Sequence, residues 1–279
     1  PIYINNIIDA SDIILPDTIA PYCYQYMFKG CVNMVTPPAL PSKTLAEGCY
    51  MGMFYDCVTM SVAPQLPSDP NTTLYNSCFE NMFWNCMSIA ECPALPYTTL
   101  ADSCYAGMFN GCISLDAPAD LPSDQLNLWC YYRMYATIND SSFSLGSHNE
   151  LTATVLAKYC YYAMLENTDI LESPKFNDAA EIYERCYQCM LKATSISEVD
   201  LPAVDPGTNH SLAAFANLFM GCANLCDITW RSDWSPEELF NRFWVKGVAE
   251  TGTFHANLTG SYEEGVHGVP EHWTVEPLN

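Results

Sequence analysis

The chain has 279 residues, of which 49% are hydrophobic, and it carries 32 acidic against 10 basic side chains. The hydrophobic fraction is ample for a large core, which excludes an intrinsically disordered chain. The formal net charge of −22 would be repelled by nucleic-acid phosphates and by anionic membranes, so we expect neither as a partner. No run of about 18 apolar residues occurs, so we also expect no membrane span.

The first 22 residues resemble part of a unit that recurs along the chain. Leu15 and Pro16, followed by Ile19 four residues before Cys23, match the LP and TL elements of that unit. We therefore predict that residues 1–22 form an N-terminal partial repeat that caps the first complete unit.

A nine-residue cysteine motif recurs from Cys23 onward. Its clearest copies are CYQYMFKGC (23–31), CYMGMFYDC (49–57), CFENMFWNC (78–86) and CYAGMFNGC (104–112). Weaker copies are CYYRMYATI (130–138), CYYAMLENT (160–168), CYQCMLKAT (186–194) and AFANLFMGC (214–222). The steps between their first residues are 26, 29, 26, 26, 30, 26 and 28, so the basic unit has 26 residues. A fixed period of this length predicts a solenoid over residues 23–226.

Each unit is predicted to contain a short helix. Thr44 and Glu47 have the spacing of a capping hydroxyl and a carboxylate at a helix start. Leu45, Cys49 and Met53 follow at intervals of four and would share one face of the helix. Such a short amphipathic element buries its apolar face only when successive units stack.

Each unit is also predicted to contain one short strand. The stretch from Cys112 to Pro118 is too short for a second helix and precedes prolines, which favours an extended conformation. Stacked units would align these strands in a parallel ladder. The predicted fold is an α/β solenoid of the leucine-rich-repeat type, with about eight units and a cap at each end.

The fifteen cysteines occupy repeated positions, which favours small buried hydrophobic side chains over ligands. Cys186 with Cys189, and Cys222 with Cys226, are closely spaced, but neither pair is accompanied by a second pair of zinc ligands. We expect no metal and no cofactor, while occasional disulfides between units remain an alternative. Tyrosines recur directly after the motif's first cysteine, and we expect them in the core or at its edge rather than on a sugar-binding platform: Tyr24, Tyr50, Tyr105, Tyr131 and Tyr161.

No catalytic residue is assigned. The five histidines lie outside the motif copies, and a surface location explains them. Glu237 and Glu238 are explained by a helix start, and Glu263 and Glu264 by a solvated turn, so a glycosidase-like carboxylate pair is not favoured.

Residues 227–279 depart from the repeat and are predicted to form the C-terminal cap and tail. Ser235, Pro236 and Glu238 have the pattern of a helix start, which predicts a short helix through Phe243. Aromatic cover for the last unit would come from four tryptophans: Trp230, Trp234, Trp244 and Trp273. The glycine-rich stretch 247–273 is predicted to be extended and rich in turns.

The complete unit, LxxxPxLPxxTLxxxCYxxMFxxC, resembles BspA-like leucine-rich-repeat proteins in their cysteine- and methionine-rich variant, over about residues 11–226. Units five to seven depart from the pattern because Ile138, Thr168 and Thr194 replace the second cysteine, so a looser or differently shaped core is expected there. The resemblance implies surface proteins of gut and oral bacteria, protists or phages that act in adhesion and host recognition.

On this resemblance we expect an extracellular, non-enzymatic recognition module on a virion or bacterial cell surface that binds a protein or glycan of a host or partner. A structural subunit that contacts its own copies, as a homo-oligomer or larger assembly, is the alternative. A carbohydrate-active enzyme is third.

Three steps longer than 26 residues place insertions around 68–72, 139–149 and 203–210. Insertions in a solenoid emerge at the surface, and we expect these three to cluster on one edge as the binding side; neutral loops are the alternative. The candidate binding residues are Asp69, Asn71, Asn139, Phe143, His148, Asp205 and His210.

Overall fold

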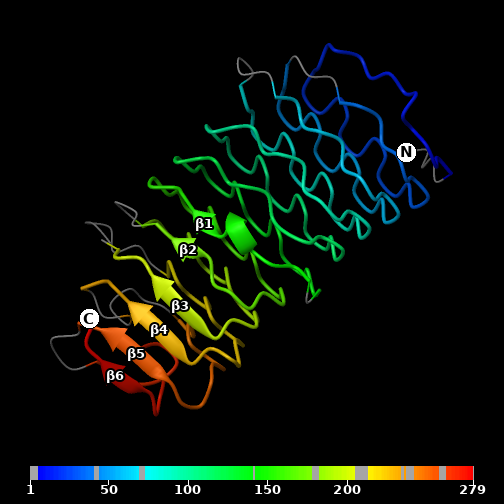
Figure 1. Ribbon diagram of the computed structural model, residues 1–279. Coiled ribbons are helices and arrows are strands. Elements are labelled where there is room, and N and C mark those ends of the chain that lie inside the picture. The colour runs from blue at the N-terminus through cyan, green and yellow to red at the C-terminus, as the bar shows by residue number, and fades with distance from the viewer. Residues whose placement is uncertain are drawn as a thin grey trace.

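The chain winds into a parallel-sheet solenoid with its N-terminus at one end and its C-terminus at the other (Figure 1). The computed structural model describes residues 6–40, 44–68, 73–140, 142–177, 182–204, 213–233, 236, 242–257 and 262–278. Among them, no helix has the length and hydropathy needed to cross a membrane. The prediction of a solenoid is confirmed.

All six strands of the described residues run parallel, in two sheets. One sheet pairs β1 (Glu150–Leu151) with β2 (Lys175–Phe176), and the other has β3 (Glu198–Leu201), β4 (Asp227–Trp230), β5 (Thr253–Ala256) and β6 (Thr274–Glu276) in that order. Alternate residues of β3, β4 and β5 are buried, so one face of the larger sheet packs on the core. Strands occur only from Glu150 onward in this part of the chain, so the structure does not support eight units with one strand each.

The cysteine motif is a run of consecutive turns and not a helix. In the motif copy that starts at Cys49, the N–H groups of Cys49, Met51 and Met53 donate to carbonyls three residues earlier in the chain. The alternate N–H groups donate to the following copy instead, as Tyr50 does to the Cys78 carbonyl at 3.0 Å. An α-helix bonds every N–H to the carbonyl four residues earlier, so the prediction of an α/β fold with a helix in each unit is wrong. Within the described residues, helical structure is limited to the short 3-10 helix η1 (Gly146–His148) and the single 3-10 residue Pro236.

A four-residue period explains why the turns looked like a helix. Leu45, Cys49 and Met53 are all buried, as the helix prediction required. Over two turns, a period of four cannot be told from the 3.6 residues of a helix. The distinguishing feature is the backbone, because every fourth residue has a positive φ, with 55° at Gly48, 57° at Gly52 and 61° at Asp56. Glycine, asparagine and aspartate adopt this conformation most readily and are poor helix formers.

Two columns of stacked rings fill the core between successive motif copies. The first column runs through Tyr24, Tyr50, Phe79, Tyr105, Tyr131, Tyr161, Tyr187 and Phe215, with ring centroids 5.4–6.2 Å apart. The second runs through Phe28, Phe54, Phe83, Phe109 and Tyr135, with centroids 5.5–5.8 Å apart. All of these rings are buried. The prediction that the motif tyrosines belong to the core is therefore confirmed.

The cysteines of the motif form further columns beside the rings. All fifteen are free thiols and twelve of them are buried; Cys23 and Cys226 are exposed and Cys92 is partly buried. The thiol of Cys57 donates to the Phe28 carbonyl of the preceding copy at 3.1 Å, and Cys86 and Cys112 repeat this contact. The motif cysteines therefore behave as small core side chains. No group of three or more potential metal ligands occurs among the described residues.

Units five to seven keep a closed core although they lack the second cysteine. Ile138 and Thr168 are fully buried, and Thr194 is 4% exposed. The hydroxyls of Thr168 and Thr194 each donate at 2.9 Å to a carbonyl three residues earlier, so neither is left unsatisfied. Burial at these positions contradicts a looser core, whereas the alternative of a differently shaped core stays a prediction.

The C-terminal segment continues the same bonding pattern beyond residue 226. Its strands β4, β5 and β6 extend the sheet, and the N–H of Phe219 donates to the Trp244 carbonyl at 2.8 Å. Trp230, Trp244 and Trp273 are buried. The described part of this segment therefore continues the solenoid instead of departing from it, and its role as a cap stays a prediction. Trp234 and most of the helix predicted through Phe243 lie outside the described residues.

Replacing either Tyr105 or Tyr131 by phenylalanine is expected to raise the free energy of unfolding by about 1 kcal/mol. Both hydroxyls are buried without a hydrogen-bond partner, and the same column already contains Phe79. Chemical denaturation of the two variants measures the change, with Tyr97→Phe as the control because its hydroxyl donates to the Pro67 carbonyl at 2.7 Å. Destabilisation by Tyr105→Phe would show that its hydroxyl has a hydrogen-bond partner in the folded protein.

The native protein should show two fast-reacting thiols, those of Cys23 and Cys226, and a slow remainder. Burial raises the pKa of Cys57 and of Cys104 to about 12, so at about pH 8 these groups hold almost no thiolate, the form that reacts. Titration with a disulfide reagent before and after unfolding measures both populations. Six or more disulfides in protein prepared without reductant would contradict a core of free thiols.

Candidate functional site

The predicted binding residues do not form one site in the described residues. Asn139 is exposed, and exposed His148 places its Nδ1 2.5 Å from Asp120 Oδ1. Phe143 is only 2% exposed and packs 6.1 Å from the Tyr135 ring, so it belongs to the core and is unsuited to contact a partner. The other four residues lie outside the described part of the chain: Asp69, Asn71, Asp205 and His210. Clustering of the three insertions on one edge therefore stays a prediction.

A groove of about 900 Å³ runs across the outer face of β2, β3 and β4. Some of its charged side chains form ion pairs. Arg231 clasps the Asp200 carboxylate through two nitrogens at 2.5 and 2.6 Å, and Lys175 lies 3.8 Å from Glu150. Four carboxylates and two cations line the groove, which leaves it negatively charged and poorly suited to an acidic ligand: Glu172, Glu198, Asp200 and Asp227 against Lys175 and Arg231.

The strongest candidate is a set of four half-buried aromatic side chains on the outer side of the turn segments, here called the aromatic patch: Trp129, Tyr132, Tyr159 and Tyr162. Trp129 and Tyr159 stack in parallel with ring centroids 4.0 Å apart. Tyr132 lies 5.5 Å from Tyr162, and Tyr162 lies 6.1 Å from Tyr159. Rings on two neighbouring motif copies thus form one continuous surface.

The turn geometry positions this patch. Trp129 and Tyr159 directly precede their motif copies and both have positive φ, 58° and 59°. The four-residue period directs the first two residues of each group inward and the next two outward, so Tyr132 and Tyr162 face away from the buried neighbours Tyr131 and Tyr161. Partial burial raises the pKa of Tyr162, which keeps its hydroxyl protonated and able to donate a hydrogen bond at neutral pH.

Basic side chains surround the patch, although the protein as a whole is strongly acidic. The guanidinium of Arg185 lies 5.8 Å from the centroid of the Tyr159 ring. Lys158 lies 3.2 Å from Glu184, which also accepts a hydrogen bond from the Tyr159 hydroxyl at 3.3 Å. Five of the ten basic residues of the chain fall between 133 and 192: Arg133, Lys158, Lys175, Arg185 and Lys192.

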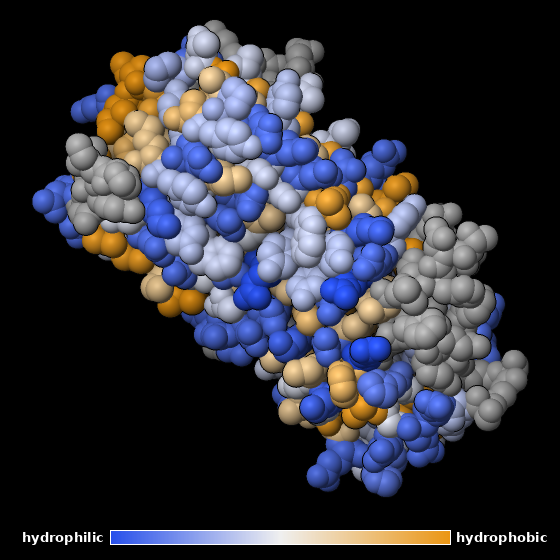
Figure 2. All heavy atoms as spheres, turned by 180° about the vertical axis from the view of Figure 1, so that it is seen from behind, coloured by the Kyte–Doolittle hydropathy of each residue, from blue (hydrophilic) through white to orange (hydrophobic). Residues whose placement is uncertain are grey.

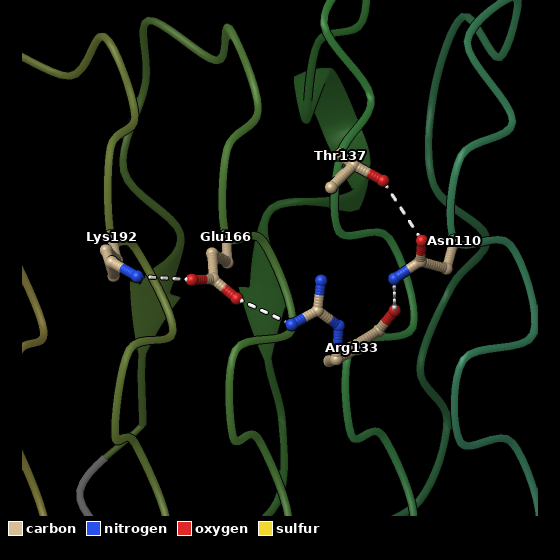
Figure 3. Close-up of polar contacts among 5 residues, drawn as sticks. All are labelled: Asn110, Arg133, Thr137, Glu166 and Lys192. Carbon is tan, nitrogen blue, oxygen red and sulfur yellow. Dashed lines mark hydrogen bonds and ion pairs between the residues drawn. The ribbon is translucent and has the colours of Figure 1, made fainter.

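A line of polar contacts crosses the turn segments beside the patch (Figure 3). Glu166, whose side chain is 9% exposed, accepts from Arg133 at 3.0 Å and from Lys192 at 2.7 Å. Asn110 extends the line by donating to the Arg133 carbonyl at 3.4 Å and accepting from the Thr137 hydroxyl at 3.0 Å. One carboxylate therefore ties three successive motif copies together and holds Arg133 next to Tyr132.

A smaller aromatic cluster occupies the same side nearer the N-terminus. Tyr55 stacks on Trp84 at 5.8 Å, and the Lys29 ammonium lies 4.4 Å from the Tyr55 centroid and 5.1 Å from the Tyr26 centroid. Trp84 also lies against Gly107, where a Cβ atom would come within 2.9 Å of the indole. Glycine in the next copy therefore makes room for the indole.

The sequence pointed to the wrong aromatic residues. It drew attention to the tyrosine after the first cysteine because that position recurs, but that side chain faces the core. The patch occupies the variable positions of the motif, which differ from copy to copy. The available sequence signal was the presence of aromatic residues at the same variable positions of two adjacent copies: Trp129, Tyr132, Tyr159 and Tyr162.

No protein-family model, curated protein or solved structure matches the chain. The geometry of the patch therefore carries the functional argument.

Replacing Glu166 by alanine is expected to lower the free energy of unfolding by about 2 kcal/mol, because Arg133 and Lys192 would lose their shared, largely buried carboxylate. Both cations retain some solvent access, which keeps the loss below that for a fully buried pair. Urea denaturation measures the change. Glu184→Ala is the matched control, and it should cost less than about 0.5 kcal/mol because its pair with Lys158 is exposed. Equal losses for the two variants would contradict a bridging role for Glu166.

Proposed function

We propose that this protein is a non-enzymatic recognition module, displayed on a virion or bacterial cell surface, that binds an acidic glycan at the aromatic patch. The single observation that carries the proposal is the continuous aromatic surface of Trp129, Tyr132, Tyr159 and Tyr162 beside basic side chains. Rings of this kind stack on the apolar faces of sugars, and their hydroxyl and indole groups donate hydrogen bonds.

Charge supports an acidic ligand over a neutral one. Among the described residues around the patch, four basic side chains face three carboxylates, which gives a local formal charge of +1 within a chain of −22: Arg133, Lys158, Arg185 and Lys192 against Asp102, Glu166 and Glu184. A carboxylated or sulfated sugar would be attracted here and repelled by most of the remaining surface.

The resemblance to BspA-like leucine-rich repeats supports display and adhesion. The same proposal includes the assignment of the eight motif copies as repeat units of that family. The protein therefore acts by holding a rigid, partly preformed surface toward a partner. The proposed location is extracellular, on a phage virion or on a bacterial cell surface.

Direct binding to defined oligosaccharides tests the proposal. The double variant Trp129→Ala with Tyr159→Ala should bind heparin-derived and sialylated oligosaccharides roughly tenfold more weakly than the unchanged protein, because the stacked pair supplies the flat surface. Binding should also weaken with added salt. Isothermal titration calorimetry measures both effects.

Tyr75→Ala is the matched control, since Tyr75 is 46% exposed and lies outside the patch. It should leave binding unchanged. Neutral dextran oligosaccharides provide the second control and should bind weakly. Absence of binding to any acidic oligosaccharide, with the fold intact by circular dichroism, would contradict the proposal and leave a protein partner as the ligand.

A further inference from the structure

Tyr55 and Trp84, here called the second ring pair, form an aromatic surface that the proposed function does not use. Both side chains are half-buried, and their rings stack with centroids 5.8 Å apart. The Trp84 indole N–H and the Tyr55 hydroxyl have no hydrogen-bond partner among the described residues, and neither atom is buried. Partial burial of the ring raises the pKa of Tyr55, so its hydroxyl stays protonated and can donate at neutral pH.

The surface between this pair and the aromatic patch is continuous across the fourth motif copy. Ala106, Gly107 and Asn110 hold outward positions in that copy, yet all three are buried, so side chains of neighbouring copies lie over them. The Trp84 indole is one of these, because a Cβ atom on Gly107 would come within 2.9 Å of it. Trp84 and Tyr132 belong to the third and fifth copies, which places them two steps of the stack apart, roughly 10 Å along the axis. A chain molecule that lies along the solenoid axis can therefore contact both.

The charges around the second ring pair differ from those around the aromatic patch. The Asn85 amide donates to one carboxylate oxygen of Asp56 at 3.0 Å, and the other oxygen of Asp56 has no partner in the described part of the chain. Glu80 adds a second carboxylate in the same motif copy as Trp84. The Lys29 ammonium lies 4.4 Å from the centroid of one of the two rings. Two carboxylates against one cation leave this region negatively charged, so it does not attract an anionic sugar.

The hydroxyl groups of a neutral sugar match these polar groups. A hydroxyl both donates and accepts, so one sugar can accept from the Trp84 indole N–H and donate to the free oxygen of Asp56. The two rings supply the apolar surface that sugars also contact. Mildly hydrophilic residues form much of the surface along the middle of the molecule when it is seen from behind (Figure 2). A surface of this kind suits a ligand rich in hydroxyl groups.

We propose that the second ring pair binds a neutral sugar of the same glycan whose acidic sugar binds at the aromatic patch. The ligand is then a linear polysaccharide that contains both acidic and neutral sugars and lies along the solenoid axis. This inference rests on the proposed function, because it places the acidic sugar at the aromatic patch. Two linked contacts raise the affinity of a long chain above that of a fragment that reaches only one of them.

Hyaluronan fragments test the proposal, because their linear chain alternates an acidic with a neutral sugar. The decasaccharide should contact both surfaces and bind roughly tenfold or more tightly than the disaccharide, which reaches the aromatic patch alone. Trp84→Ala should remove this gain and leave the affinity for the disaccharide unchanged. Isothermal titration calorimetry measures the decasaccharide and ligand-observed NMR the disaccharide. Equal affinities of the unchanged protein for the two fragments would overturn the inference.

The indole N–H signals of the protein locate the contact directly. The chain has six tryptophans, and Trp84→Phe, which keeps an aromatic ring, identifies the Trp84 signal. This signal should shift with the decasaccharide and not with the disaccharide, whereas the Trp129 signal should shift with both. A Trp84 signal that stays in place while the Trp129 signal moves would overturn this inference and leave the proposed function standing.

Tyr75→Ala is the matched control, because Tyr75 is a 46% exposed aromatic residue outside both surfaces. It should keep the full difference between decasaccharide and disaccharide, and circular dichroism verifies that every variant folds. Hyaluronan that fails to bind at either length, while heparin-derived or sialylated oligosaccharides bind, would overturn the inference alone. Failure of every acidic oligosaccharide would overturn the proposed function as well.

Discussion

The rest of this structure depends on how backbone N–H groups alternate between acceptors in their own motif copy and acceptors in the following copy. Within each motif copy, every second N–H closes a turn in its own copy, and the others donate to the following copy. A single copy therefore leaves about half of its donors unsatisfied, and unsatisfied buried donors are costly. The copies form a stable structure only as a stack, and each stack has one edge of acceptors and one edge of donors.

Side-chain chemistry follows from this backbone. Four-residue turns direct two neighbouring side chains inward and the next two outward, so Tyr131 joins the aromatic column while Tyr132 reaches the surface. Equivalent side chains on successive copies must stack, which suits rings and small thiols. The same repetition on the outer side turns single aromatic residues into a continuous surface, and it places Glu166 between cations of two other copies.

The proposed recognition uses the outer side of this scaffold. Recognition at the aromatic patch depends on the outward positions of the turns, which vary freely because they do not carry the core.

The sequence by itself determined the repeat, its 26-residue period, the stacking of copies and the inward placement of the cysteine, tyrosine and methionine of each motif. Those features follow from apolar side chains recurring at fixed intervals, and they are visible at Cys49, Tyr50 and Met53 without coordinates. Only the tertiary structure decided between helix and turns, because the two have nearly the same side-chain period and differ in where alternate N–H groups find acceptors. It also decided the candidate site, since Trp129 and Tyr159 lie 30 residues apart in the chain and become neighbours, 4.0 Å apart, only when successive copies stack.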